Sequence, residues 1–422
     1  SVKVTVPASM SAAPGVLVRQ RCQFEGCRGI ENAHITLTNV QIPVEQVIGD
    51  VGKGLKYALT ILNVGRGISI PAICLGMAKQ AWQPTLDRAT TRITFQKPLA
   101  ERQTQQIRIG DMANHLFAME ALALLVWRLA DQHRYDIRIE AAVAKIFCSE
   151  HTIRFLRDAQ TIFGGMGYET AESKETRGEA AFGIEQLVRD AEMYRIGEGA
   201  TDILRPFVVR EGLSPHLDRA KGFYAGDLSI LDQTRQALKL ARFYLPWYLQ
   251  QWRRRPLPDR PEYAHPHVRP LARYVERTSR RLARKTFHVM VRFQRSFQDE
   301  QRLQNAIEAV GEDLLAILAA VLHAERQTRI DGHTTVWELA DAFRATAMQR
   351  IERRLKEFRR NQDSLTMATG AQAIKGSYPS LSHGIILRRL DDYTPRKRST
   401  RPITHPDTLA DAVEGCEPPA IP

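Results

Sequence analysis

The chain has 422 residues, 43% hydrophobic and 25% charged, a composition typical of a globular protein rather than a disordered or fibrous one. This length allows two or three domains of roughly 100–200 residues each. The longest uncharged apolar runs, Ala121–Trp127 and Leu314–Ala324, are shorter than the roughly 18–20 residues that a membrane span needs, so we expect no transmembrane segment.

The net charge of +13 is concentrated in the second half, because Leu213–Pro422 carries 35 Lys/Arg against 24 Asp/Glu. Such an excess suits anionic lipid or a polyanionic ligand, and it is equally compatible with solvated helix faces. Charge is the only feature that would suggest a nucleic-acid partner, and we do not expect one. The basic clusters are Arg253–Arg255, Arg280-Arg281, Arg284-Lys285, Arg353-Arg354, Arg359-Arg360 and Arg396–Arg398.

The five cysteines are scattered and lack zinc-ligand spacing, which predicts reduced thiols, with Cys148 in the core. No metal site is expected at His265-Pro-His267. The start lacks both a signal-peptide pattern and a methionine, and SVKVTVPA resembles the inside of a strand. We therefore expect a piece of a larger, non-secreted protein in a cytoplasmic or matrix-like reducing compartment.

Residues 1–50 have strand character, with apolar positions at Ile35, Leu37, Val40 and Ile42 before Pro43. Helical periodicity begins at Leu55 and continues beyond Gly65-Arg66-Gly67. Further helices are predicted over Ile107–Leu129, from Ile139 to Gly164-Gly165, and after Glu198. Long helices with short connections predict an up-and-down bundle over residues 51–212.

The helical patterns in residues 213–395 predict a second helical domain, and the composition of residues 396–422 predicts a disordered tail. The RRRPLPDRPEYAHPH segment reads as a linker or long loop. The expected fold is mainly α, with a remnant of β-structure at the N-terminus, a four-helix bundle and a helical extension. Its candidate helices are about Ser229–Trp252, His267–Phe297, Leu303–Glu325 and Thr335–Arg360.

The segment MYRIGEGATDILR, Met193–Arg205, places Glu198 between two glycines just before a helical pattern. Flanking glycines indicate a backbone that bends freely and approaches another group closely. A glutamate there could be a functional carboxylate, or it could stabilise the positive end of the following helix dipole.

Four segments in this order resemble the acyl-CoA dehydrogenases, flavoenzymes that introduce a double bond between Cα and Cβ of fatty acyl-CoA. The resemblance covers roughly residues 26–212, and the basic extension is similar to the very-long-chain, membrane-associated branch. It implies the end of the family's middle β-domain over residues 1–50 and its catalytic bundle over 51–212. The segments are NVQIPVEQVIGDVGKGLKYALTILNVGR, TTRITFQKPLAERQTQQ, AAVAKIFCSE with TIFGGMGY, and VRDAEMYRIGEGATDILRPFVVREG.

The resemblance implies a role for each matching position. Glu198 corresponds to the base that removes the α-proton while hydride passes to N5 of FAD. Residues beside the acyl-CoA correspond to Asn63, Arg66, Gly199 and Arg210. Flavin-contacting segments, one of which reaches the FAD of a neighbouring subunit, correspond to Arg92, Thr94, Phe95, Arg102, Gln103, Thr161, Gly164, Gly165, Ala200, Thr201 and Asp202.

Simpler interpretations remain open: Arg92 and Arg102 as solvated charges, Arg66 as a buried ion-pair partner, and Gly164-Gly165 as a helix cap. The chain also departs from the family pattern. Pro206 should delay or kink the helix after Glu198. Residues 169–186 contain about ten extra residues, which predict an enlarged charged loop near the flavin edge. The other departures are Gly197 for an aromatic residue, Ala200 for a hydroxyl residue, and Thr161 for a glutamine.

The expected function is FAD-dependent dehydrogenation of long-chain acyl-CoA in fatty-acid β-oxidation, with an electron-transfer flavoprotein as acceptor. Alternatives are an acyl-CoA oxidase and a catalytically weakened scaffold relative. The resemblance also implies a homo-oligomer, with a dimer expected. Trp247 and Trp252 beside Arg253–Arg255 suggest peripheral membrane contact, or Trp residues packed inside a bundle with solvated arginines.

Overall fold

The computed structural model describes residues 14–134, 136–224, 230–257, 265–358 and 363–385. They belong to two compact units, residues 1–52 with 363–422, and Lys53–Gln362. Four expectations concern residues outside the described ranges: the opening SVKVTVPA, the centre of the linker, Arg359-Arg360 and the tail 396–422.

The first unit contains one antiparallel pair of strands, β1 (Val16–Arg21) and β2 (Ala33–Leu37). Val16 lies opposite Leu37, and an irregularity between Val18 and Gln20 shifts the register. The predicted strand therefore ends at Leu37 and does not extend to Ile42. The unit also holds η2 (Val44–Gln46), α13 (Asp363–Ile374) and η7 (Pro379–Ser382).

The second unit begins with a helical stretch made of α1 (Gly54–Val64), the π-helical turn η3 (Gly65–Ser69) and α2 (Ile70–Thr91). The predicted continuation past Gly65-Arg66-Gly67 is thus confirmed. A short hairpin, β3 (Ile93–Thr94) and β4 (Lys97–Pro98), and the 3-10 turn η4 (Leu99–Glu101) lead into α3 (Gln103–Asp131) and α4 (Arg138–Phe163).

The bundle is completed by α5 (Gly165–Tyr168), α6 (Ala171–Glu175), α7 (Ile184–Ile196) and α8 (Thr201–Tyr224). The expectation that Pro206 delays this last helix is wrong. It begins at Thr201 and includes both Pro206 and Pro215, because its surroundings hold the first turn in place, as described below.

The extension forms α9 (Ile230–Gln250), α10 (Val268–Phe293), η6 (Gln294–Asp299), α11 (Gln301–Asp331) and α12 (Val336–Glu357). All four helices predicted there are confirmed. Helix α8 runs uninterrupted across the expected boundary at residue 213, so a helix spans that position. The proposed domain division itself stays a prediction.

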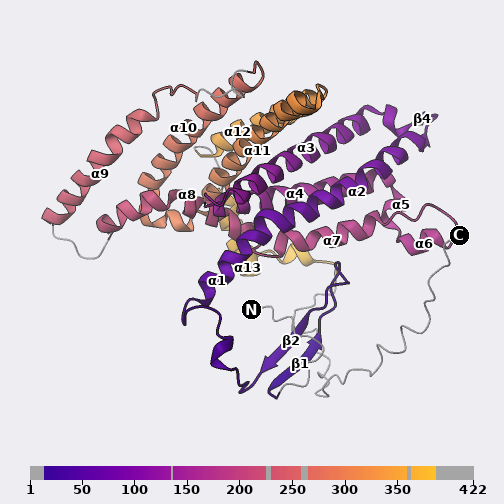
Figure 1. Cartoon of the computed structure of the whole chain (residues 1–422), viewed down its shortest axis with the longest axis horizontal. Coiled ribbons are helices and arrows are strands. Elements are labelled where there is room, and N and C mark those ends of the chain that lie inside the picture. Colours follow the sequence, from indigo (N-terminus) through magenta and orange to yellow (C-terminus); the bar gives the residue numbers. More distant parts are fainter. Residues whose placement is uncertain (1–13, 135, 225–229, 258–264, 359–362, 386–422) are drawn as a thin grey trace. The chain divides into compact units, whose positions relative to one another are not determined.

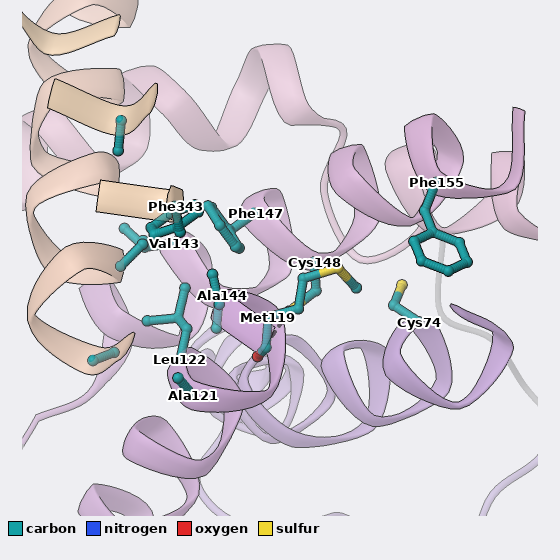
Figure 2. Packing of buried hydrophobic residues seen from close by; sticks show 14 of the residues in the cluster. Cys74, Met119, Ala121, Leu122, Val143, Ala144, Phe147, Cys148, Phe155 and Phe343 are labelled. Atoms are coloured by element: carbon teal, nitrogen blue, oxygen red, sulfur yellow. Dashed lines mark hydrogen bonds between the residues drawn. The ribbon is translucent and has the colours of Figure 1, made fainter. Parts of the chain in front are cut away.

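The core is shared between the bundle and the extension. Cys148, as predicted, is fully buried, and Phe147 beside it meets Phe343 of α12 with ring centroids 6.0 Å apart. Figure 2 shows Phe343 next to Val143 and Phe147 of α4. Burial of such large apolar side chains stabilises each by roughly 1.5–3 kcal/mol, so α12 is held by the same core as the bundle.

Two helical stretches, Gly54–Thr91 and Gln103–Asp131, are long and apolar enough to cross a membrane by length and composition. In the second, 61% of the apolar window is buried inside the unit, as in a core helix, and in the first 35% is buried. The sequence analysis considered only uncharged apolar runs, and it therefore missed both stretches, in which single polar residues interrupt the apolar sequence. Length and composition alone do not assign either stretch to a membrane.

Candidate active site

The loop between α7 and α8 holds Glu198 in an unusual backbone conformation. Its φ is +56°, in the left-handed region, and Gly199 follows with φ +108°. Residues other than glycine adopt such angles only where the surrounding structure enforces them, and these positions cluster at functional sites. The loop should therefore be held by identifiable contacts.

Two buried cations supply those contacts. Arg66 donates from Nε to the main-chain oxygen of Glu198 at 2.7 Å. Lys145, whose side chain is fully buried in α4, donates from Nζ to the main-chain oxygens of Arg195 at 2.9 Å and Gly199 at 2.8 Å. The backbone on both sides of Glu198 is thus fixed to α4 and to η3.

Glu150 holds the ends of the two flanking helices together. Its Oε1 accepts from Arg195 Nε at 3.1 Å and from the hydroxyl of Thr201 at 2.8 Å. Thr201 is the first residue of α8, so this bond positions the start of that helix. The Thr201 hydroxyl, predicted to contact flavin, donates within the protein to Glu150.

The carboxylate of Glu198 lies against Gly65, the first residue of η3. A Cβ built on Gly65 would overlap all three carboxyl atoms, so only glycine leaves this space. Oε2 of Glu198 is buried. Asn63 and Arg66 lie within one turn of Gly65, so the structure brings together four predicted residues, Asn63, Arg66, Glu198 and Gly199.

Arg210 does not join this group. It is exposed on α8, nine residues beyond Thr201, which corresponds to roughly 13 Å along a helix. Asp202 is exposed in the first turn of α8, and Ala200 precedes that turn.

The electrostatics of the group are dominated by burial of positive charge. Burial lowers the pKa of Lys145 from 10.5 to about 8, against the opposing effect of Glu150. Burial also lowers the pKa of Arg66, although Glu198 raises it. Both cations are bonded to main-chain oxygens of the loop, so they fix the position of the Glu198 carboxylate, and a general base must hold such a fixed position beside the carbon acid.

The second group of predicted residues begins at the β3–β4 hairpin. Its two turn residues, Phe95 and Gln96, have φ of +47° and +65°, the pattern of a tight hairpin turn. Arg102 donates to the main-chain oxygens of Thr94 and Phe95 and lies 5.8 Å from the Phe95 ring centroid. Phe95 is 93% exposed, so the hairpin presents an ordered aromatic ring outward.

Gly164 and Gly165 lie at the end of α4. Gly164 ends that helix with φ +67°, and no atom lies within 4 Å of a Cβ built on either residue. Another group could therefore approach the backbone closely here, and Arg92 is exposed at the end of α2. Thr161 donates to Arg157 of its own helix, whereas Gln160 donates to Gly167 and supports the glycine turn.

These two groups occupy opposite ends of the bundle. Arg66 and Arg92 are separated along α1–η3–α2 by roughly 35–40 Å at 1.5 Å per residue. Figure 1 shows β4 and α5 at one end and α1 and α8 at the other. Within one chain, the hairpin group and Glu198 therefore do not surround one common space.

Sequence reasoning missed three residues that organise these ends: Lys145, Glu150 and Lys174. Lys174 is fully buried in α6 and donates from Nζ to the main-chain oxygens of Met166 at 3.0 Å and Phe182 at 2.6 Å. It orders the additional segment 169–186, expected only as a charged loop. The signal was present at Lys145, a lysine within the apolar run AAVAKIFC.

Comparison with known proteins is consistent with this geometry. The family described as "Acyl-CoA dehydrogenase, C-terminal domain" matches residues 52–213. "Probable acyl-CoA dehydrogenase FadE10" of Mycobacterium tuberculosis is 37% identical over 380 residues, 89% of this chain and 58% of that protein. This chain thus spans less than two thirds of the length of that relative.

The mouse mitochondrial very long-chain specific acyl-CoA dehydrogenase is 35% identical over 187 residues, 44% of this chain and 27% of that protein. That match covers less than half of either protein, so the expected similarity to the very-long-chain branch is not shown.

A crystal structure of an acyl-CoA dehydrogenase complexed with FAD from Bacillus anthracis superposes with a TM-score of 0.62. It covers 90% of this chain and 62% of that protein at 22% identity, which shows a common fold. Residues 52–213 therefore match the C-terminal domain of the acyl-CoA dehydrogenases in sequence, and the chain shares the fold of an acyl-CoA dehydrogenase.

Proposed function

We propose that this chain supplies the catalytic bundle of an FAD-dependent acyl-CoA dehydrogenase, an oxidoreductase that forms trans-2-enoyl-CoA from a long-chain acyl-CoA. One observation carries the proposal: the Glu198 carboxylate lies against Gly65 on a left-handed loop that Arg66 and Lys145 hold by its carbonyl groups. The name of FadE10 and the matched family support the same reaction class.

In this proposal Glu198 removes the proton from Cα of the thioester. Its fixed backbone limits the positions of the carboxylate, so the base and the bound thioester react as two groups already held in position. Asn63 and Gly199 line the place of the thioester. Bound FAD supplies the acceptor for the hydride that leaves Cβ.

The residues proposed to hold FAD divide between the two ends of the bundle. Ala200 and Asp202 lie beside Glu198, whereas Arg92, Phe95 and Gly164 lie at the far end. One cofactor can meet both groups if the second group comes from another copy of the chain. The proposal therefore includes a homo-oligomer, with a dimer as the simplest form.

An electron-transfer flavoprotein is the proposed electron acceptor of the reduced flavin.

Peripheral membrane contact is proposed for the extension. Trp252 is 64% exposed and Arg284 lies 4.0 Å from its ring centroid, as suits an interface with anionic lipid. Trp247 instead packs 5.7 Å from Phe287, so the two tryptophans have different roles.

The test is flavin bleaching in the complete protein. A long-chain acyl-CoA should reduce bound FAD in the wild type, and Glu198→Gln should lower the rate by at least about 1000-fold while FAD stays bound. Exposed Glu101→Gln is a matched control and should bleach normally. Unchanged bleaching by Glu198→Gln rejects the assignment of the base. Peroxide formed in stoichiometric amount would identify an oxidase instead.

A further inference from the structure

A cavity of about 360 Å³ lies where bundle and extension helices meet, and it contains none of the residues assigned to the reaction above. Helices α4, α8, α9, α10 and α11 contribute to its walls, with Val143, Val208, Leu282 and Leu315 among the apolar side chains. This volume lies within the range of small-molecule sites, which are mostly apolar with a few polar groups.

Aromatic side chains form the wall contributed by α9. The rings of Tyr244 and Trp247 lie 5.2 and 5.7 Å from the ring of Phe287 on α10. Tyr244 also lies in hydrogen-bond contact with His216 of α8, at 3.2 Å. These contacts join α9 to α8 and α10 at the wall of the cavity.

Two carboxyl groups on α11 supply the polar part of the cavity. Glu308 is fully buried and accepts from Arg205 at 2.6 Å, and Glu312 lies one turn further along. Burial raises the pKa of both groups, and the neighbouring Glu308 raises the pKa of Glu312 further. Asp313, the next residue, pairs separately with Arg350 at 2.6 Å, whereas Arg205 lowers the pKa of both Glu308 and Glu312 against the effect of burial.

The same carboxyl groups have unused acceptor atoms. Among the residues that the structure describes, the two carboxyl groups are hydrogen-bonded to each other, and no N–H or hydroxyl group donates to the buried Glu308 Oε1 and Glu312 Oε2. A buried polar atom left without a partner costs free energy, so a donor that reached these oxygens would bind favourably. An anionic group there would be repelled by Glu308.

We propose that this cavity binds a small aliphatic molecule whose polar end is a hydrogen-bond donor, an ammonium group in preference to a hydroxyl group. The hydrocarbon lies along the apolar walls, and the donor meets Glu308 and Glu312. An ammonium group is preferred because it can replace the proton that the two carboxyl groups share, releasing it to solvent, so that each carboxylate then faces a cation, Arg205 or the ammonium group. The site does not depend on the proposed dehydrogenase activity.

Gly311 offers a way to block the cavity without disturbing its walls. It lines the cavity from the middle of α11, and no atom lies within 4 Å of a Cβ built on it. Gly311→Leu should therefore fill the space and raise the midpoint temperature, because leucine is a better helix former than glycine. Gly76→Leu on α2, equally open but outside the cavity, is the matched control.

The experiment is calorimetric titration of the complete protein with octylamine, 1-octanol and octanoate below their aggregation concentrations. Octylamine and octanol should each bind once per chain, with octanoate at least about tenfold weaker. Gly311→Leu should weaken octylamine binding by at least about tenfold and Gly76→Leu should not. Glu312→Gln should weaken octylamine binding at least about fivefold and change octanol binding by less than about twofold.

Four results overturn the proposal: no saturable binding of octylamine to the wild type, equal affinity for octanoate, unchanged binding in Gly311→Leu, or unchanged preference in Glu312→Gln. Thermal melts of each variant show whether it is folded. If a variant melts at or above the midpoint temperature of the wild type, its loss of binding is attributable to the cavity.

Discussion

Two buried lysines hold the two ends of the bundle, and they do so by the same means. Lys145 donates to two main-chain oxygens of the Glu198 loop, and Lys174 donates to two main-chain oxygens of the segment beyond Gly164-Gly165. Both side chains are fully buried, and burial lowers the pKa of each amine. The difference lies in what each lysine holds.

Lys145 reaches from α4 to a separate loop about 50 residues later, and that loop carries a strained carboxylate. Lys174 belongs to the segment that it orders. The first contact positions a reactive group, whereas the second folds a connection. The two lysines make the same number of hydrogen bonds, but we expect only the loss of Lys145 to lower kcat strongly. Substitutions can test this difference.

The largest effect is expected from Gly65→Ala at the Glu198 end. The new Cβ would displace the carboxylate, and a misplacement of about 1 Å can cost about 100-fold in kcat. Stability should not fall, because alanine is favoured over glycine in a helix by about 1 kcal/mol. Steady-state turnover and thermal melts of the complete protein measure both. Gly76→Ala, where a Cβ meets open space, should change stability alone.

Replacement of each lysine by methionine compares the two ends directly. Both variants leave two buried oxygens without a donor, so each should lose roughly 1–3 kcal/mol in the free energy of unfolding. Lys145→Met should also lower kcat about tenfold, whereas Lys174→Met should keep kcat within about twofold. Urea unfolding and initial rates test this. Equal losses of kcat would abolish the distinction between the two ends.

The pKa of Lys145 predicts a dependence on pH. Because the folded-state pKa is about 8 and the ordinary value is 10.5, the folded protein binds fewer protons than the unfolded chain between these values. The stability of the wild type relative to Lys145→Met should therefore rise from about pH 8 to about pH 10. Urea unfolding of both proteins at the two pH values measures it. A constant or falling difference contradicts the lowered pKa.

The smallest effect on turnover is expected at the hairpin end. Arg102→Ala removes the bonds to Thr94 and Phe95, so the hairpin should lose its fixed form. We expect FAD affinity to fall about tenfold while kcat at saturating FAD stays unchanged. Lys97→Ala, which removes a neighbouring exposed cation without those bonds, is the control. A loss of kcat with unchanged FAD binding would reverse the roles of the two ends.

Periodicity predicted most of the long helices because their apolar faces repeat along the chain, but it missed α7. It predicted neither the start of α8 at Thr201 nor the order in segment 169–186. Both depend on single polar contacts, Glu150 with Thr201 and Lys174 with Phe182, and contacts of this kind have no periodic signature. The separation of Arg92 from Glu198 also required coordinates, since the order of the motifs along the chain does not show which of them lie at the same end of the bundle.

The π-helical turn η3 sets the rotation of α1 about the helix axis relative to α2. Each residue of an α-helix turns the chain by about 100°, so removal of one residue from Gly65–Ser69 would swing Asn63 and its neighbours about a quarter of a circle around the axis. The buried face of α2 would stay in place while the surface that receives Glu198 turned elsewhere. Changes of length are therefore tolerated far less in these five residues than in the loops.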